Sequence, residues 1–334
     1  MSTLKSINVQ HPSATTINIV NDSSGNVTVG NNLTVTGTST LTGNVTAAGT
    51  VAMASSFKRN RIINGNMLID QRNAGASVTP TAATYTVDRW TTNLTQASKF
   101  SVQQNAGSVT PPAGFTNYLG VTSLSSYSVL AGDYFALLQN IEGFNASDLA
   151  WGTANAKTVT LSFWVRSSLT GTFGGSLTNS ALNRSYPFTY TISSANTWEQ
   201  KSITIAGDTT GTWLTDNSVG IRVYIGLGAG STYSGTAGAW AAATYLSATG
   251  ATSVVGTNGA TFYITGVQLE VGTKATPYEM QIYNDQLAQC QRYYYSSYGA
   301  GVAPSTATNL GMIVLIGGQG SVNYPVQMRA APTP

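Results

Sequence analysis

Residues 159–166 have the sequence VTLSFWVR, in which apolar and polar side chains alternate. Leu161, Phe163 and Val165 therefore share one face of an extended strand, because successive side chains of a β-strand point to opposite faces. The alternation recurs in three further segments, 198–205, 219–225 and 262–269. Gly-rich stretches separate these segments, and many short strands with such turns are typical of a jelly roll or a related β-sandwich. The sequence thus predicts an all-β fold with a jelly-roll β-sandwich over residues 58–280.

The segment before this region, residues 58–90, is the most ionic part of a weakly charged chain. It holds five of the fifteen Lys and Arg residues. Asn64-Gly65 stands between two apolar runs, and this dipeptide is a strong signal for a hairpin-like turn. We expect one partly buried ionic knot to fix the entry of the chain, and a ligand-binding role is the alternative for the same residues. The knot consists of Asp70, Arg72, Asp88 and Arg89.

Composition narrows the function classes. Charged residues make up 8% of the 334 residues and the net charge is +3, so the chain has no basic face for nucleic acid. His11 is the only histidine and Cys290 the only cysteine, which excludes a His-dependent triad within one chain and an intrachain disulfide. The start of the chain lacks the apolar core of a signal peptide, and its longest aliphatic run, 312–316, is too short to span a bilayer. We predict neither nucleic-acid binding nor membrane insertion.

Residues 1–57 are too poor in apolar side chains to form a core alone. Residues 1–22 form a head piece, and in residues 23–57 glycines recur at positions 25, 30, 37, 43 and 49 between short Val/Thr or Leu/Thr runs. Such spacing indicates stacked β-rungs, each of which exposes an apolar side chain that only another copy could bury. We therefore expect an intertwined homotrimeric β-shaft, with a flexible linker as the alternative.

Residues 281–334 change character again. The segment 283–298 is the one good helical stretch, with Asn284 or Asp285 as the expected N-cap. One apolar stripe at three- and four-residue spacing is expected to form its packing face: Met280, Tyr283, Leu287, Cys290 and Tyr294. The sequence that follows the helix predicts the start of a C-terminal β-segment.

The stretch RNRIINGNMLIDQRNAGASVTP at 59–80, followed by YTVDRW at 85–90, resembles the entry to the head domain of phage tail fibres, notably marine and cyanobacterial ones. The pattern of predicted strands in residues 59–280 is similar to that of the carbohydrate-binding-module-like jelly rolls found in such fibres. The resemblance implies that residues 1–22 attach to a phage tail or baseplate protein, that the product is part of the virion after synthesis in the host cytoplasm, and that the natural chain continues past Pro334.

No motif indicates an enzyme. A glycosidase needs two facing carboxylates, and the nearest local pair in the sequence is Asp208 and Asp216, for which a turn role is the stronger interpretation. The chain has no nucleophile elbow, P-loop or zinc-protease motif. We predict no cofactor; a structural calcium ion stays open, although no oxygen-rich signature for one is present.

Binding is better supported than catalysis, because loop regions are rich in aromatic, amide and hydroxyl groups. Four aromatic residues between 207 and 250 are the candidate sugar-binding residues: Trp213, Trp240, Tyr233 and Tyr245. Trp90, Phe163 and Trp164 lie on predicted strands and are expected in the core or on a sheet face. The sequence favours a tail-fibre adhesin that binds a host surface polysaccharide. The alternatives are a spacer fibre whose receptor tip lies elsewhere and, third, a polysaccharide depolymerase.

Overall fold

The computed structural model describes residues 58–296, 298, 302, 306 and 324–331, together with three short strands nearer the N-terminus. The chain divides into two compact units, Met1–Ala54 and Ser55–Pro334. In the first unit, β1 (Asn8–Val9), β2 (Ile19–Asn21) and β3 (Val27–Val29) pair antiparallel in the order β1-β2-β3. Apart from β3, the predicted shaft lies outside the described residues, and the trimer stays a prediction.

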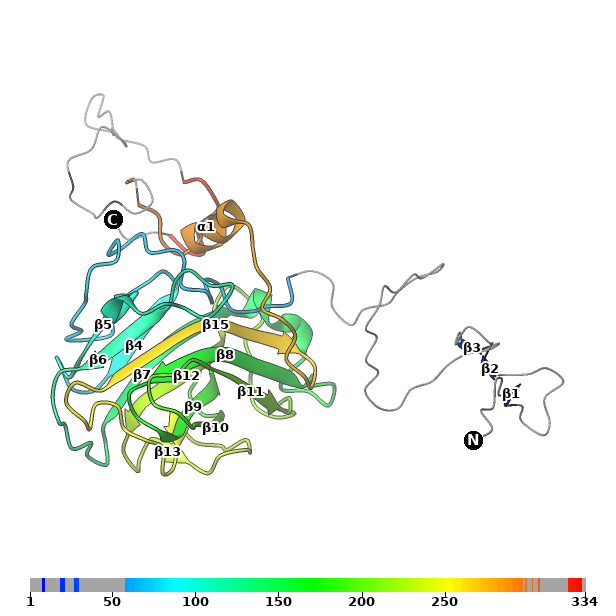
Figure 1. Ribbon diagram of the computed structural model, residues 1–334, viewed down its shortest axis with the longest axis horizontal. Coiled ribbons are helices and arrows are strands. Elements are labelled where there is room, and N and C mark those ends of the chain that lie inside the picture. The colour runs from blue at the N-terminus through cyan, green and yellow to red at the C-terminus, as the bar shows by residue number, and fades with distance from the viewer. Residues whose placement is uncertain are drawn as a thin grey trace, which may run out of the picture. The chain divides into compact units, whose positions relative to one another are not determined.

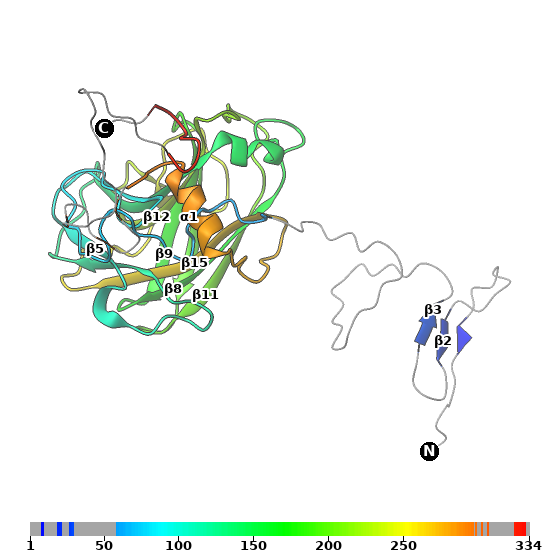
Figure 2. The same ribbon diagram turned by 90° about the horizontal axis from the view of Figure 1, so that it is seen from above.

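The second unit is a sandwich of two five-stranded antiparallel sheets (Figures 1 and 2), which confirms the predicted β-sandwich. The first sheet has the order β10-β9-β12-β7-β4, with β10 (Ser185–Ile192), β9 (Gly171–Asn179), β12 (Val219–Ala229), β7 (Tyr134–Glu142) and β4 (Trp90–Leu94). The second sheet has the order β11-β8-β15-β6-β5, with β11 (Glu199–Ile205), β8 (Val159–Ser167), β15 (Thr261–Val271), β6 (Leu119–Ser123) and β5 (Phe100–Gln104).

The core lies between the two sheets. Leu161, Phe163 and Val165 of β8 are fully buried there, as their alternation predicts, and their apolar area is removed from water. Phe100 of the second sheet meets Phe135 of the first edge-to-face, with ring centroids 6.3 Å apart. Such contacts across the layers fix the spacing of the sheets.

The outer face of the first sheet is also covered. The loop after β12 carries the two short strands β13 (Ser234–Gly235) and β14 (Ser247–Ala248), which pair parallel. From this loop Leu246 packs on Ala136, Leu138 and Tyr224. The centre of the first sheet is therefore buried on both sides, and its central strands β7 and β12 carry side chains that are mostly buried on either face.

The Asn64-Gly65 turn is present, but its apolar flanks are not strands, so the predicted hairpin is wrong. The side chain of Asn64 is the reason: its Nδ2 donates to the carbonyls of Ile69 (2.8 Å) and Asp88 (2.9 Å), and its Oδ1 accepts from the amide of Ile69 (3.0 Å). Its backbone carbonyl accepts from the Trp90 indole at 3.1 Å. In a hairpin, the backbone of the paired strand would supply these hydrogen bonds. Here the buried side-chain amide of Asn64 supplies them.

The predicted helix is present as α1 (Tyr283–Gln291), which begins after Ile282, but it ends earlier than expected, because residues 292–296 are not helical. Ile282 makes no side-chain cap, and Asn284 lies inside the helix, so the expected N-cap is wrong. The buried face consists of Gln286 and Cys290, whereas Tyr283 is exposed, and only part of the predicted stripe packs. Three 3₁₀ turns complete the unit: Ala106–Ser108, Gly143–Asn145 and Ser147–Leu149. In the part of the chain that the structure describes, no helix has the length and apolarity needed to cross a membrane.

Replacing Gly65 with Ala should destabilise the second unit by roughly 2–4 kcal/mol. A Cβ at this position would clash with the backbone carbonyl oxygen of Val267, whose amide donates to the Gly65 carbonyl at 3.0 Å. Urea unfolding of the intact chain measures the loss. Gly132→Ala is the control, because a Cβ there meets nothing within 4 Å. Equal stability of the two variants would contradict this account of the entry turn.

Candidate functional site

A groove of about 620 Å³ lies on the outer face of the second sheet. Its floor comes from β8 and β11, and its walls come from the loop at 113–115 and the segment at 275–280. Figure 1 shows β8 at the front of the sandwich between β15 and β11. Unlike the outer face of the first sheet, this part of the second sheet is left open between its flanking loops.

Strand register gathers the floor residues. Trp164 pairs with Gln200, and Ser162 pairs with Ser202, so the four side chains share the face opposite the core. The alternation that turns Phe163 inward thus turns Trp164 outward. The floor offers one large aromatic ring beside an amide and two hydroxyl groups, which is a mixture of apolar surface with a few polar groups of the kind found in ligand sites.

The walls are held by hydrogen bonds. The amide and hydroxyl of Thr276 donate to Glu270 at 2.8 and 2.7 Å, and the amide of Glu279 donates to Gln268 Oε1 at 2.8 Å. On the opposite side, the indole of Trp198 donates to the carbonyl of Thr110 at 2.9 Å. Both walls are therefore anchored to strands of the second sheet or to their ends, and the groove is largely preformed.

Two aromatic rings meet above the floor. Phe115 and Tyr278 contact edge-to-face, with centroids 5.2 Å apart, and burial raises the pKa of Tyr278. Gly266 makes this approach feasible: its φ is +62°, and a Cβ there would lie 2.6 Å from the Phe115 ring and 3.2 Å from Trp164. Gly266 sits where the pairing of β15 with β8 shifts register, so a bulge creates the space.

The groove is close to electrically neutral. Of the residues that line it, Lys201 alone is charged, and its Nζ pairs with Glu199 Oε2 at 2.6 Å. The hydrogen bond from Lys201 lowers the pKa of Glu199, although partial burial opposes this. The groove is consequently suited to an uncharged ligand. Among the described residues, no group of three or more His, Cys, Asp and Glu side chains is placed to hold a metal ion.

The predicted Trp213 and Trp240 are brought together, but by packing on each other. Their ring centroids are 5.3 Å apart, and Trp151 lies 4.7 Å from Trp213 and 5.3 Å from Trp240, all edge-to-face. The indole N–H of Trp240 donates to the carbonyl of Ala206 (2.8 Å) and that of Trp213 to the carbonyl of Thr210 (3.2 Å). Their polar edges are thus satisfied within the protein. A small pocket of about 290 Å³ reaches Trp151 and Trp213.

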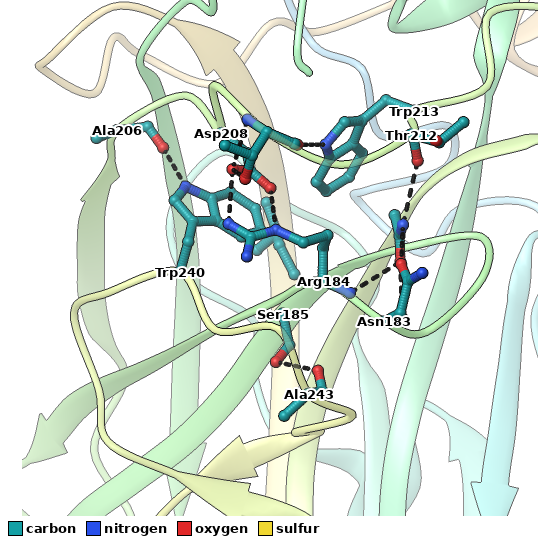
Figure 3. Close-up of polar contacts among 12 residues, drawn as sticks. Asn183, Arg184, Ser185, Ala206, Asp208, Thr212, Trp213, Trp240 and Ala243 are labelled. Atoms are coloured by element: carbon teal, nitrogen blue, oxygen red, sulfur yellow. Dashed lines mark hydrogen bonds and ion pairs between the residues drawn. The ribbon is translucent and has the colours of Figure 1, made fainter. Parts of the chain in front are cut away.

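An ion pair lies beside Trp213 and Trp240, as Figure 3 shows. Arg184 Nε and Nη2 donate to the two carboxylate oxygens of Asp208 at 2.7 and 2.8 Å. Burial disfavours the charged carboxylate, but the hydrogen bonds from Arg184 and Thr210 outweigh it and lower the pKa of Asp208. Asp216 instead accepts from the amide of Ser218 at 2.8 Å. Neither carboxyl has the raised pKa of a general acid.

Tyr233 and Tyr245 belong to the cover of the first sheet. Tyr233 contacts Tyr134 edge-to-face with centroids 4.9 Å apart, and the Tyr245 ring lies where a Cβ on Gly235 would be. The four loop aromatics therefore form no shared surface patch. Sequence reasoning missed Trp164, Phe115 and Tyr278 as a set. The alternation at 159–166 was the one available signal, because it places Trp164 opposite the core.

The expected ion pairs among Asp70, Arg72, Asp88 and Arg89 are absent, although all four residues are described. Asp70 accepts from the amides of Asn73 (2.9 Å) and Gly75 (2.7 Å), and Asp88 accepts from the side-chain amide of Gln71. The guanidinium groups lie over tyrosine rings beyond α1 instead, as cation–π contacts. Their carbons are 3.7 Å from the Tyr294 centroid for Arg72 and 3.4 Å from the Tyr293 centroid for Arg89.

No protein-family model matches the chain, and no curated protein matches it in sequence. Among solved structures, the enzymatically active domain of bacteriophage CBA120 tailspike protein 4 is 12% identical with a TM-score of 0.34; the match covers 64% of this chain and 22% of that one. A putative sugar-binding protein of Bacteroides thetaiotaomicron is 10% identical over 64% of this chain and all of that one, with a TM-score of 0.36. The family 11 carbohydrate-binding module of a Clostridium thermocellum cellulase is 10% identical over 60% and 98%, with a TM-score of 0.29. At such scores the likeness carries no argument about function.

The buried carboxyl of Asp88 should make stability depend on pH. Burial raises its pKa from 3.8 to about 6, against hydrogen bonds from Gln71 that lower it. Between these values the native state binds more protons than the unfolded state, so the free energy of unfolding should fall as pH rises from about 4 to 7, by roughly 2–3 kcal/mol. Urea unfolding at several pH values measures this slope.

Asp88→Asn should remove the titration of this carboxyl, so that the free energy of unfolding changes less with pH. Asp216→Asn is the control: hydrogen bonds with Ser218 lower the pKa of this exposed carboxyl, so it titrates below the tested range. A slope that Asp88→Asn leaves unchanged would contradict the assignment.

Proposed function

We propose that the sandwich binds a neutral glycan chain in the groove over β8. The observation that carries this proposal is the joint presence of Trp164, Phe115 and Tyr278 with Gln200 and Ser202 in a groove without an unpaired charge. Aromatic faces pack against the C–H faces of sugar rings, while amide and hydroxyl groups exchange hydrogen bonds with sugar hydroxyls. The groove volume of about 620 Å³ falls within the range of roughly 300–1,000 Å³ that is usual for small-molecule pockets.

The biological role that we propose is that of a phage tail-fibre adhesin, built into the virion and directed at a host surface polysaccharide. The resemblance of residues 59–90 to tail-fibre head domains supports it, with residues 1–22 as the part that attaches to the tail. Several heads on one particle would convert a weak groove into firm attachment, because each further contact is made at high effective concentration.

The proposed mechanism is binding without hydrolysis. Glycoside cleavage requires two carboxyl groups on either side of the scissile bond, one of them with a raised pKa. No Asp or Glu is among the residues that line the groove. Burial raises the pKa of Asp88, but this carboxyl is enclosed beside Gln71 at the chain entry and does not lie in the groove.

A spacer role is the second candidate, and one surface favours it. Met280, Ile282 and Tyr283 expose 53%, 74% and 40% of their surface at the start of α1, and Met280 also lines the groove. Apolar side chains gathered on a surface mark interaction sites. If copies of the chain pack through these residues, they would close the groove as well.

Trp164→Ala should weaken binding of a neutral host polysaccharide roughly 10- to 100-fold, because a central aromatic anchor commonly carries about 2 kcal/mol or more. Affinity electrophoresis or calorimetry of the intact chain measures this, with product sizing to detect cleavage. Phe144→Ala is the matched control, since Phe144 is an exposed aromatic residue outside the groove. Equal loss in both variants, or binding that survives Trp164→Ala, would place the site elsewhere; shortened polysaccharide would make the chain an enzyme.

The intact chain should form a homotrimer, with a mass by light scattering about three times the 34.8 kDa of one chain. The physical reason is the apolar side chains of residues 23–57, which one copy cannot bury. A monomer across the accessible concentration range would reject the trimeric shaft. A trimer in which Trp164→Ala has no effect on binding would support the spacer role instead.

A further inference from the structure

Arg89 is a buried cation that forms no ion pair within the part of the chain that the structure describes. Its exposed fraction is 6%, it forms no ion pair with any described carboxylate, and its Nε lacks a hydrogen-bond partner. Its Nη2 donates a hydrogen bond to the carbonyl of Asn140, and its guanidinium carbon lies over the Tyr293 ring, 3.4 Å from the centroid. Burying a charge in this way costs several kcal/mol unless an opposite charge compensates it. Its φ of +74° adds backbone strain.

A cavity of about 100 Å³ lies beside this guanidinium. Its lining includes Tyr85, Asn140, Ser218, Tyr293 and a second cation, Arg329. This volume exceeds the ~30 Å³ that one water occupies in the liquid, and it is far below the ~300 Å³ at which pockets for drug-sized ligands begin. The space therefore suits a compact ion and not a sugar chain.

The local charges favour an anion. Glu142 also borders the cavity, but its carboxylate is already engaged by Arg292 (2.5 and 3.0 Å) and by the Tyr293 hydroxyl. Arg89 and Arg329 place two positive charges beside the cavity, and neither forms an ion pair with a described carboxylate, although the charge of Arg329 lowers the pKa of Glu142. Burial, and to a smaller extent Arg329, lower the pKa of Arg89. The side-chain oxygen of Asn140 has no partner either, and this amide can turn to present its NH₂ group.

The chain itself has almost no carboxylate left to fill the site. Eleven of its twelve Asp and Glu residues lie between 58 and 296, and Asp22 is the twelfth. Residues 297–334 contain none. Those nearest to Arg89 in sequence, Asp70 and Asp88, are occupied by backbone amides and Gln71. The Asp and Glu side chains nearest to Arg89 in sequence therefore supply no counter-ion to it.

We propose that a compact oxyanion, either a carboxylate or a phosphate group, binds in this cavity between Arg89 and Arg329. Guanidinium groups present paired N–H donors that match the two oxygens of such groups, and charge-assisted hydrogen bonds are the strong ones. The bound anion neutralises the buried charge and ties β7 to the segment that carries Arg329. The proposal is independent of glycan binding, because the two sites lie on different sheets and differ in charge.

The test uses inorganic phosphate and acetate with the intact chain, at constant ionic strength adjusted with chloride. Isothermal titration calorimetry and the phosphorus NMR line width should show saturable binding with Kd below about 10 mM for at least one of the two ions. Arg329→Gln should weaken that binding by roughly 10- to 100-fold, the effect of one charge-assisted hydrogen bond. Arg166→Gln is the matched control, since Arg166 lies on the second sheet, away from the cavity.

Comparing acetate with phosphate distinguishes a carboxylate ligand from a phosphate ligand. Tighter binding of acetate assigns the cavity to a carboxylate, as in a sugar acid or peptide terminus, whereas tighter binding of phosphate assigns it to a phosphate group. Arg89→Met removes the buried charge and should abolish any rise of the melting temperature with phosphate. Absence of saturable binding by either ion, or equal binding by Arg329→Gln and Arg166→Gln, overturns the proposal.

Discussion

A sheet in a two-layer sandwich has one face in the core and a second face that must be either covered or polar. The two sheets solve this constraint differently. Loop residues around Leu246 cover the outer face of the first sheet, where Tyr224 and Leu138 are apolar. The second sheet places Ser162, Trp164 and Gln200 on its outer face and leaves part of it open. The position of the groove follows from this asymmetry.

Few charges hold the unit together, in line with a chain that is 8% charged. Side-chain amides link distant segments where other proteins often use ion pairs. Asn64 joins the entry turn to the carbonyls of Ile69 and Asp88. Asn60 forms hydrogen bonds with the backbone of Val267 and Leu269 in β15. Neutral groups lose less hydration on burial than ions, so such links can lie deep in the fold. Arg72 and Arg89 extend them to Tyr294 and Tyr293 through cation–π contacts.

The sequence predicted best where a local period decides the structure. Alternation placed Leu161, Phe163 and Val165 in the core, and the helix was found from its spacing. The sequence could not predict contacts that depend on segments distant in the chain. The sequence indicated Trp213 and Trp240 as loop aromatics, and both are partly exposed, but nothing local shows that they pack on each other and on Trp151.

The same limit applies to the entry segment and the groove. Opposite charges close in sequence suggested a knot of ion pairs, but the tyrosines that stack on Arg72 and Arg89 lie beyond α1. Likewise Phe115 and Tyr278 are remote in sequence and meet over Trp164 only because β15 bulges at Gly266. Burial against a partner that is distant in the chain has no local signature.

Because the chain contains few charged residues, the unpaired guanidinium of Arg89 points to a ligand. In a highly charged protein a neighbouring carboxylate would meet it at little cost, but here Glu142 is committed to Arg292 and Asp208 to Arg184. An arginine that remains buried without a counter-ion, over a small cavity shared with Arg329, lowers stability unless it binds something. The neutral groove and this cationic cavity therefore select ligands of different chemistry, and phosphate that fills the cavity should leave glycan binding in the groove intact.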